Sequence, residues 1–175
     1  MLNTSGQQLF YAAEDSDCLM RNCCGALRRF DMVLLDHSQR EMARFKRPFK
    51  CTARCCQLCW LPCQLQQMEV TADGVTIGSI EQQWDCTLPI YNICDDKGEA
   101  VLQIKGPVCA ISCCADINFE VLTMEGDTVG MVQKKFGGLV NEALTDADNF
   151  GITFPIDLDV KIKIVLLAAT LFIVS

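Results

Sequence analysis

The cysteines of this 175-residue chain are the residues whose chemistry stands out first, since it has thirteen of them. Five fall close together, at Cys51, Cys55, Cys56, Cys59 and Cys63. Clustered thiols can fill a core as small apolar groups, bind a metal, or carry acyl chains. The first ten residues lack the basic start and apolar core of a signal peptide, and the number of cysteines is odd. Disulfide bonds are therefore the weaker interpretation.

A zinc site is one alternative for these thiols. Cys56 and Cys59 have the spacing of a zinc-binding pair, and Cys109, Cys113 and Cys114 are available to complete the set. The chain has no second pair with this spacing, so the pattern does not select zinc over the other two uses of the thiols.

The sequence offers no set of side chains for covalent or acid–base catalysis. Its single histidine, His37, falls in a predicted polar turn. It has neither a glycine-rich phosphate-binding loop nor the glycine-flanked serine of a nucleophile elbow. We therefore expect a binding or transport protein rather than an enzyme.

Charge is distributed unevenly along the chain. The net charge of −7 argues against a general nucleic-acid binder. Residues 21–54 contain nine Lys or Arg and three Asp or Glu, whereas residues 81–159 contain four and fourteen. The basic segment is a candidate contact for anionic lipid headgroups, and ordinary solvated faces are the alternative. The basic residues around the cysteine cluster are Arg44, Lys46, Arg47, Lys50 and Arg54.

The elements that must position the cysteines and the basic residues are short strand-like runs. They occur in pairs, and the two runs of a pair are separated by a turn rich in Asp and Gly. The predicted hairpins pair 30–35 with 41–46, 65–70 with 75–80, 90–94 with 100–104, and 117–124 with 129–133. Short strands at such even spacing are typical of a β-sandwich or β-barrel. The length of 175 residues fits a single domain, 1–175.

The C-terminal segment 160–174 has a different character. After Lys163 it holds eleven consecutive uncharged residues before Ser175. A helix of this length rises roughly 17 Å, which is short of the ~30 Å hydrocarbon core of a membrane. Because a helix that is apolar on all sides can be buried in protein, we expect it inside a closed barrel, with membrane association as the alternative.

Several segments together resemble the phospholipid scramblase family, and the resemblance covers nearly the whole chain. The most specific is DADNFGITFPIDLDVK at residues 146–161. The others are AEDSDC at 13–18, RNCCG at 21–25, KRP at 46–48 before the cysteine cluster, and IKGP at 104–107 before Cys109.

The resemblance implies a tubby-like fold, which is a mainly β protein with a barrel around a central hydrophobic helix. The proline-rich N-terminal region of many members is missing from this sequence. The first strand is also expected to be missing, and the chain stops at Ser175 where relatives continue. We therefore expect a barrel truncated at both ends.

The resemblance also implies S-palmitoylation of Cys51, Cys55, Cys56, Cys59 and Cys63. One acyl chain gives marginal membrane binding, whereas several chains beside a basic patch give a stable anchor. This chain departs from the densest form of the family's cysteine run, because Arg54, Gln57, Leu58 and Gln64 interrupt it.

Residues 146–157 resemble the calcium-binding segment of scramblases, which is compared with an EF-hand loop. The implied ligands at positions 1, 3, 5, 7, 9 and 12 are Asp146, Asp148, Phe150, Ile152, Phe154 and Asp157. Phenylalanine supplies only a backbone carbonyl, and position 12 is not glutamate, so we expect weak calcium binding. The equally weighted alternative is structural: 151–156 as a strand, with Asp157 or Asp159 capping the next helix.

The implied function is calcium-dependent, ATP-independent movement of phospholipids between the leaflets of the plasma membrane, from its cytoplasmic face. The alternative is a palmitoylated adaptor that binds lipids or proteins without transporting them. In both cases the partners are a phospholipid membrane and other proteins, with covalent palmitate and a weakly bound Ca²⁺ as the cofactors.

Overall fold

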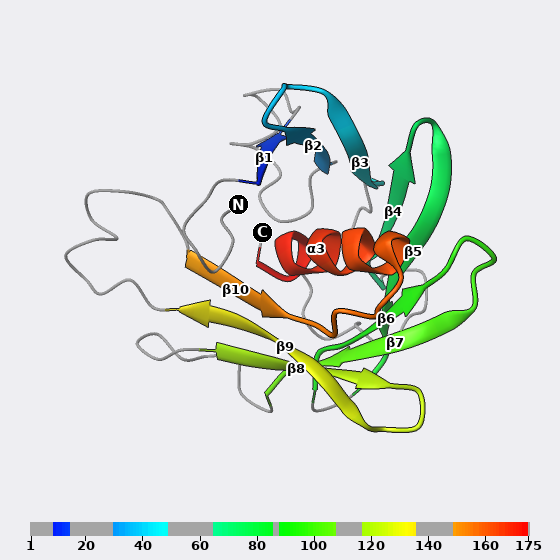
Figure 1. Cartoon of the computed structure of the whole chain (residues 1–175). Helices are drawn as coiled ribbons and strands as arrows, with labels where there is room; N and C mark the ends of the chain where they lie inside the picture. The colour runs from blue at the N-terminus through cyan, green and yellow to red at the C-terminus, as the bar shows by residue number, and fades with distance from the viewer. Residues whose placement is uncertain are drawn as a thin grey trace, which may run out of the picture.

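A computed structural model describes residues 9–14, 30–48, 65–85, 88–107, 117–135 and 149–174. Within these ranges the chain forms ten antiparallel strands and one helix, labelled as in Figure 1. Their bounds are β1 (Phe10–Glu14), β2 (Phe30–Asp36), β3 (Glu41–Arg47), β4 (Gln67–Ala72), β5 (Val75–Gln83), β6 (Ile90–Cys94), β7 (Ala100–Lys105), β8 (Ile117–Thr123), β9 (Thr128–Lys135), β10 (Asn149–Thr153) and α3 (Val160–Val174).

The strands lie in the sheet in the order in which they occur in the sequence, from β1 to β10. The four predicted hairpins are confirmed as β2–β3, β4–β5, β6–β7 and β8–β9. In the β4–β5 turn, Asp73 and Gly74 have φ values of 51° and 76°. Positive φ at both central residues gives a turn whose twist matches that of the paired strands, and Asp-Gly is a favoured sequence there.

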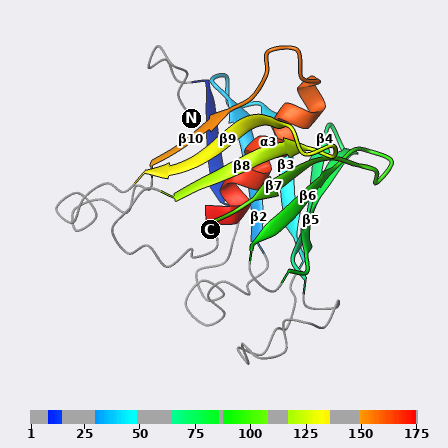
Figure 2. The ribbon, with the colours of Figure 1, turned by 90° about the horizontal axis from the view of Figure 1, so that it is seen from below.

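The prediction of a mainly β fold, with serial hairpins around a C-terminal helix, is confirmed, but the sheet is not closed. Figure 1 shows the sheet curving around α3, and Figure 2 shows the same arrangement from below. Among the described residues β1 pairs only with β2, and β10 only with β9. A closed barrel requires backbone pairing between the first and last strands, and this pairing is missing from the described part of the chain.

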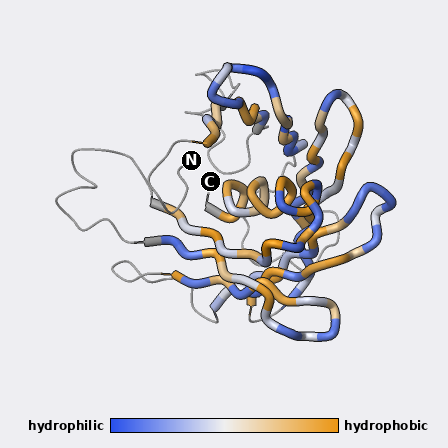
Figure 3. Tube along the Cα trace, in the orientation of Figure 1, coloured by the Kyte–Doolittle hydropathy of each residue, from blue (hydrophilic) through white to orange (hydrophobic). Residues whose placement is uncertain are grey.

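The helix α3 packs against the concave face of this sheet, mainly against β5 and β6 with further contacts to β4 and β10. After Lys163 it holds no charged residue, and Figure 3 shows mostly hydrophobic colours along it. Val165, Leu166, Ala168 and Ala169 are fully buried and belong to the same core as the inward side chains of the strands. Among the described residues, no helix is both long and apolar enough to cross a membrane.

Polar and aromatic contacts fix both ends of α3. At its start the Asp159 carboxylate accepts a hydrogen bond from the Lys161 backbone N–H at 2.7 Å, which confirms the predicted capping by Asp159. The Lys161 ammonium lies 3.1 Å from Asp96 in the β6–β7 turn. At its other end the Phe172 ring makes an edge-on contact with Tyr91, at 5.8 Å between ring centroids. The helix is therefore attached to the sheet at both ends.

Candidate functional site

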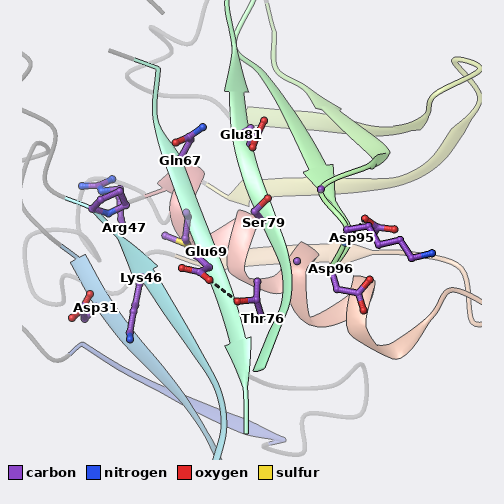
Figure 4. A pocket seen from close by; sticks show the side chains of 15 residues that line it. Asp31, Lys46, Arg47, Gln67, Glu69, Thr76, Ser79, Glu81, Asp95 and Asp96 are labelled. Atoms are coloured by element: carbon purple, nitrogen blue, oxygen red, sulfur yellow. Dashed lines mark hydrogen bonds between the residues drawn. The ribbon is translucent and has the colours of Figure 1, made fainter. Parts of the chain in front are cut away.

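A groove with a volume of about 810 Å³ lies over β4 and β5, between the end of β3 and the β6–β7 turn (Figure 4). Most of its described lining residues are polar or charged, and none of these described residues is aromatic. The lining residues are Asp31, Lys46, Arg47, Pro48, Gln67, Met68, Glu69, Thr76, Gly78, Ser79, Glu81, Asp95, Asp96, Lys97 and Gly98.

The groove begins where β3 and β4 stop pairing. Their register covers Arg44 to Lys46 on β3 and Glu69 to Thr71 on β4. Arg47 and Pro48 lie beyond the last pair and line the groove together with Gln67. The shorter pairing on this side leaves the start of β4 uncovered by β3, whereas on its other side β4 pairs with β5 along its whole length.

Strand register places a polar row across five strands. Asp31, Lys46, Glu69, Ser79 and Cys94 are consecutive cross-strand partners from β2 to β6. Side chains directly opposite on neighbouring strands share a face and lie about 5 Å apart. The hydroxyl of Thr76 donates a hydrogen bond to the Glu69 carboxylate, drawn as a dashed line in Figure 4. The first four residues of this row, Asp31, Lys46, Glu69 and Ser79, line the groove.

Two residues away along the strands, Glu81 contributes a second carboxylate. It is the cross-strand partner of Gln67 and lies two residues from Ser79. Burial is the main cause that raises the pKa of the Cys94 thiol, and the negative charge of Glu81 raises it further. A hydrogen bond with Ser79 lowers this pKa. The thiol of Cys94, which is buried, is therefore held in its neutral form beside the groove.

The predicted lipid-contacting residues are split between two faces of β3. Arg44 makes a two-point ion pair with Glu41, with distances of 3.0 and 2.8 Å. Lys46 is exposed in the groove. Arg47 is only 7% exposed, and its guanidinium lies 5.6 Å from the centre of the Phe172 ring. Residues next to one another on a strand point to opposite faces, so Arg47 lies on the face of β3 opposite to Arg44 and Lys46. Lys50 and Arg54 lie outside the described residues.

The predicted calcium ligands lie partly on an extended strand. Phe150 and Ile152 belong to β10, and Asp157 is exposed in the turn before α3. Carbonyl groups two residues apart on a strand are about 7 Å apart, whereas oxygens bound to one Ca²⁺ are each about 2.4 Å from it. In this conformation Phe150 and Ile152 therefore do not bind the same ion. Asp146 and Asp148 lie outside the described residues, and calcium binding stays a prediction.

The loop after β10 is in contact with the cationic side chain of Lys163 from α3. The Lys163 ammonium donates a hydrogen bond to the Ile156 carbonyl and lies 5.8 Å from the centre of the Phe154 ring. A calcium ion bound through the Phe154 carbonyl or Asp157 would lie close to this lysine. The resulting repulsion agrees with the expectation of weak binding.

The cysteine cluster, Cys51, Cys55, Cys56, Cys59 and Cys63, lies outside the described residues, as do Cys109, Cys113 and Cys114. In the part of the chain that the structure describes, no three metal-binding side chains come together. Acylation and zinc binding at these thiols are therefore untested by the geometry.

The groove carboxylates Glu69 and Glu81 were not identified as site residues from the sequence. One signal was available, since Gln67 and Glu69 alternate with the buried Met68 and Val70. Alternation places side chains on one face of a strand. It does not tell which strand lies alongside, so the row from Lys46 to Ser79 required the tertiary structure.

Comparison with known proteins places the chain in a family. The family model described as Scramblase matches residues 1–174. Phospholipid scramblase 2 of Bos taurus is 47% identical over 173 residues, which is 98% of this chain and 57% of the relative. Phospholipid scramblase 1 of Homo sapiens is 44% identical over 173 residues, 98% of this chain and 53% of the relative. Phospholipid scramblase family member 5 of Homo sapiens is 39% identical over 169 residues, which is 95% of this chain and 60% of the relative.

No solved structure matches the chain significantly. The chain spans between half and two thirds of the length of these curated relatives. Since the family model and the relatives cover nearly all of this sequence, the protein belongs to the scramblase family.

Proposed function

We propose that this protein moves phospholipids between the leaflets of the plasma membrane, from the cytoplasmic face, in a calcium-dependent and ATP-independent way. The observation that carries the proposal is its membership of the scramblase family, with 47% identity to a protein named phospholipid scramblase 2. In this proposal the protein is a lipid translocator and not an enzyme.

The proposed anchor is S-palmitoylation at Cys51, Cys55, Cys56, Cys59 and Cys63. Cys51 follows the groove residue Pro48 by three residues. Three residues of extended chain span at most about 11 Å. An acyl chain on Cys51 would therefore keep the edge of the groove close to the bilayer, where Lys46 adds an attraction to anionic lipid.

The proposed calcium dependence rests on the acidic segment before α3. Neutralising Asp146, Asp148 and Asp157 would reduce the repulsion between this segment and an anionic leaflet. Few side-chain oxygens are available there, so the calcium concentration required is in the weak-site range.

The direct test is lipid movement by the purified 175-residue chain in vesicles, with and without calcium near the millimolar range. The test variant is Asp146→Ala with Asp157→Ala. The control variant is Glu125→Ala with Asp127→Ala, which removes the same charge from the exposed β8–β9 turn. We expect calcium-dependent scrambling by the unmodified chain and the control, and its loss in the test variant. Folded, membrane-bound protein that moves no lipid would contradict the transport proposal.

A second candidate function is a palmitoylated adaptor that binds lipids or proteins without transport. The observation that favours it is the packing of α3, whose central residues Val165 and Leu166 are fully buried against the sheet. Moving a headgroup across hydrocarbon requires a polar path. A helix whose side chains already fill a protein core does not supply that path. Vesicle binding without lipid movement supports this candidate.

Acylation has its own test, because it is common to both functions. Thioester-linked acyl groups are detected by their sensitivity to hydroxylamine, in cells that express the chain. Replacing the five clustered cysteines by alanine should remove the signal and release the protein from membranes. Cys94→Ala is the control, since this thiol is buried on β6 and should not be acylated. Unchanged membrane binding of the five-cysteine variant would contradict the proposed anchor.

A further inference from the structure

Within the described part of the chain, two opposite charges in the groove have no ion-pair or hydrogen-bond partner. Lys46 and Glu81 both line it, and in the described part of the chain neither side chain forms an ion pair or a hydrogen bond. The register places Lys46 on β3 and Glu81 on β5, two strands apart and two residues out of line. Strand spacings then put their Cα atoms about 12 Å apart. The two charges do not meet each other, but both can contact a short ligand between them.

Most other charges of the groove are already engaged. Asp96 is paired with Lys161 at 3.1 Å. The Asp95 carboxylate accepts backbone hydrogen bonds within its own turn, with distances of 2.9 Å. One oxygen of Glu69 accepts a hydrogen bond from Thr76, which leaves the second oxygen for a ligand. Of the described groove residues, the ligand contacts we consider are therefore Lys46 at the β3 side and the carboxylates Glu69 and Glu81 over β4 and β5, while the further cation Lys97 lies in the β6–β7 turn.

We propose that the groove binds a phospholipid headgroup that carries a phosphate and a primary ammonium group. The phosphate contacts Lys46, and the ammonium group contacts Glu69 and Glu81. The inference rests on the proposed function, because that function makes phospholipids the molecules that this protein handles. In phosphoethanolamine and phosphoserine a two-carbon link separates the two charges, so one headgroup can reach both sides of the groove.

The lining favours a primary ammonium over the quaternary ammonium of choline. A quaternary ammonium has no N–H group, and proteins commonly hold it against aromatic faces. None of the groove residues that the structure describes is aromatic. A primary ammonium donates three hydrogen bonds, and the acceptors available to it are Glu69, Glu81, Gln67 and Ser79.

The balance of charge favours a zwitterionic headgroup over an anionic one. Among the described residues, five carboxylates and three cations line the groove, and Asp31 is the cross-strand partner of Lys46 on the side away from Glu69. A purely anionic ligand would be repelled by this excess of negative charge. A headgroup that brings its own ammonium group offsets the repulsion.

The experiment is calorimetric titration of the purified chain with water-soluble dihexanoyl phospholipids, below the concentrations at which they form micelles. The headgroups compared are ethanolamine, serine, choline and glycerol, with free O-phosphoethanolamine as a lipid-free arm. The variants are Lys46→Gln and Glu81→Gln. The controls are Lys105→Gln and Glu120→Gln, a cross-strand pair on β7 and β8 that does not line the groove.

We expect each groove variant to weaken ethanolamine-lipid binding about tenfold, since each removes a charge-assisted hydrogen bond, and the controls to bind as the unmodified chain does. The choline and glycerol lipids should bind more weakly than the ethanolamine lipid. Binding of O-phosphoethanolamine with the same sensitivity to Lys46→Gln would assign recognition to the headgroup alone; loss of that sensitivity would overturn the proposal. Equal binding of all four lipids, or equal effects of groove and control variants, would also overturn it.

This test is separate from the test of transport because no bilayer is present. Selective headgroup binding by a chain that moves no lipid in vesicles would refute the proposed function and leave the groove as a headgroup site. Scrambling by a chain without selective binding would refute the groove site and leave the proposed function intact.

Discussion

Leu166→Ala tests whether α3 is part of the folded core. Leu166 is 0% exposed and lies in the middle of the helix, among buried side chains of the sheet. The substitution removes buried apolar surface and leaves a cavity that the surrounding strands fill only partly. Such changes typically cost about 3 to 5 kcal/mol in the free energy of unfolding.

The assay is equilibrium unfolding in urea, followed by circular dichroism. With a denaturant dependence of about 2 kcal/mol per molar urea, a loss of this size lowers the midpoint by roughly 1.5 to 2.5 M. The control is Ile156→Ala, just before the helix, where the side chain is 95% exposed. An exposed substitution of this kind should change the free energy by no more than about 0.5 kcal/mol.

The comparison of the two variants decides the question. If α3 did not pack on the sheet in the isolated protein, replacing Leu166 by alanine would remove no packing contacts. Its midpoint would then fall as little as that of the Ile156 variant. Equal, small shifts in both variants would therefore refute the assignment of α3 to the core.

Three further predictions concern the frame of the fold. Asp159→Ala removes the side-chain acceptor of the Lys161 N–H at the start of α3, and should lower the free energy of unfolding by about 1 kcal/mol in the same assay. Gly130→Ala places a Cβ 2.2 Å from the Thr153 carbonyl oxygen, and should destabilise by about 1 to 3 kcal/mol and speed hydrogen exchange in β10. Backbone N–H groups of the β6–β7 turn lower the pKa of Asp95, so Asp95→Asn should reduce the loss of stability between pH 5 and pH 2.

The sign of the last prediction follows from the folded-state pKa of Asp95. Because this pKa lies below that of an unfolded aspartate, the carboxylate stabilises the fold above about pH 4. That contribution disappears as the pH falls through the folded-state pKa. Asparagine does not titrate, so an unchanged acid dependence in Asp95→Asn would contradict the assignment. Asp73→Asn is the control, since asparagine also tolerates the positive φ at that turn position. The control for Asp159→Ala is Asp157→Ala, and the control for Gly130→Ala is Gly151→Ala, where an added Cβ meets nothing within 4 Å. Effects equal to those of the test variants would refute the stated contacts.

Local sequence was sufficient to predict most of the elements. In β4, the alternation of Gln67, Met68, Glu69 and Val70 is that of a strand with one buried face. Asp73–Gly74 specifies the turn that follows, because its backbone angles suit few other residues. Both signals depend on residues that are close in sequence, so they can be recognised without knowledge of the fold.

Closure of the sheet was the part of the fold that the sequence pattern predicted wrongly. The hairpins were each predicted from their own residues, but closure depends on contact between β1 and β10, at opposite ends of the chain. The described strands do not make that contact. Residues 151–156 also had two predicted roles, and the structure shows 151–153 in β10 without deciding whether calcium binds the segment.

The sequence by itself therefore determined the hairpins, the apolar helix at 160–174 and the family resemblance, because each depends on residues that are close together in the chain. Only the tertiary structure decided that Arg47 packs on Phe172 while Lys46 faces the groove. The tertiary structure also brought Lys46, Glu69 and Glu81 into one groove. The reason is that strand register joins residues far apart in the chain, and the side on which a cation lies depends on which strands flank its own.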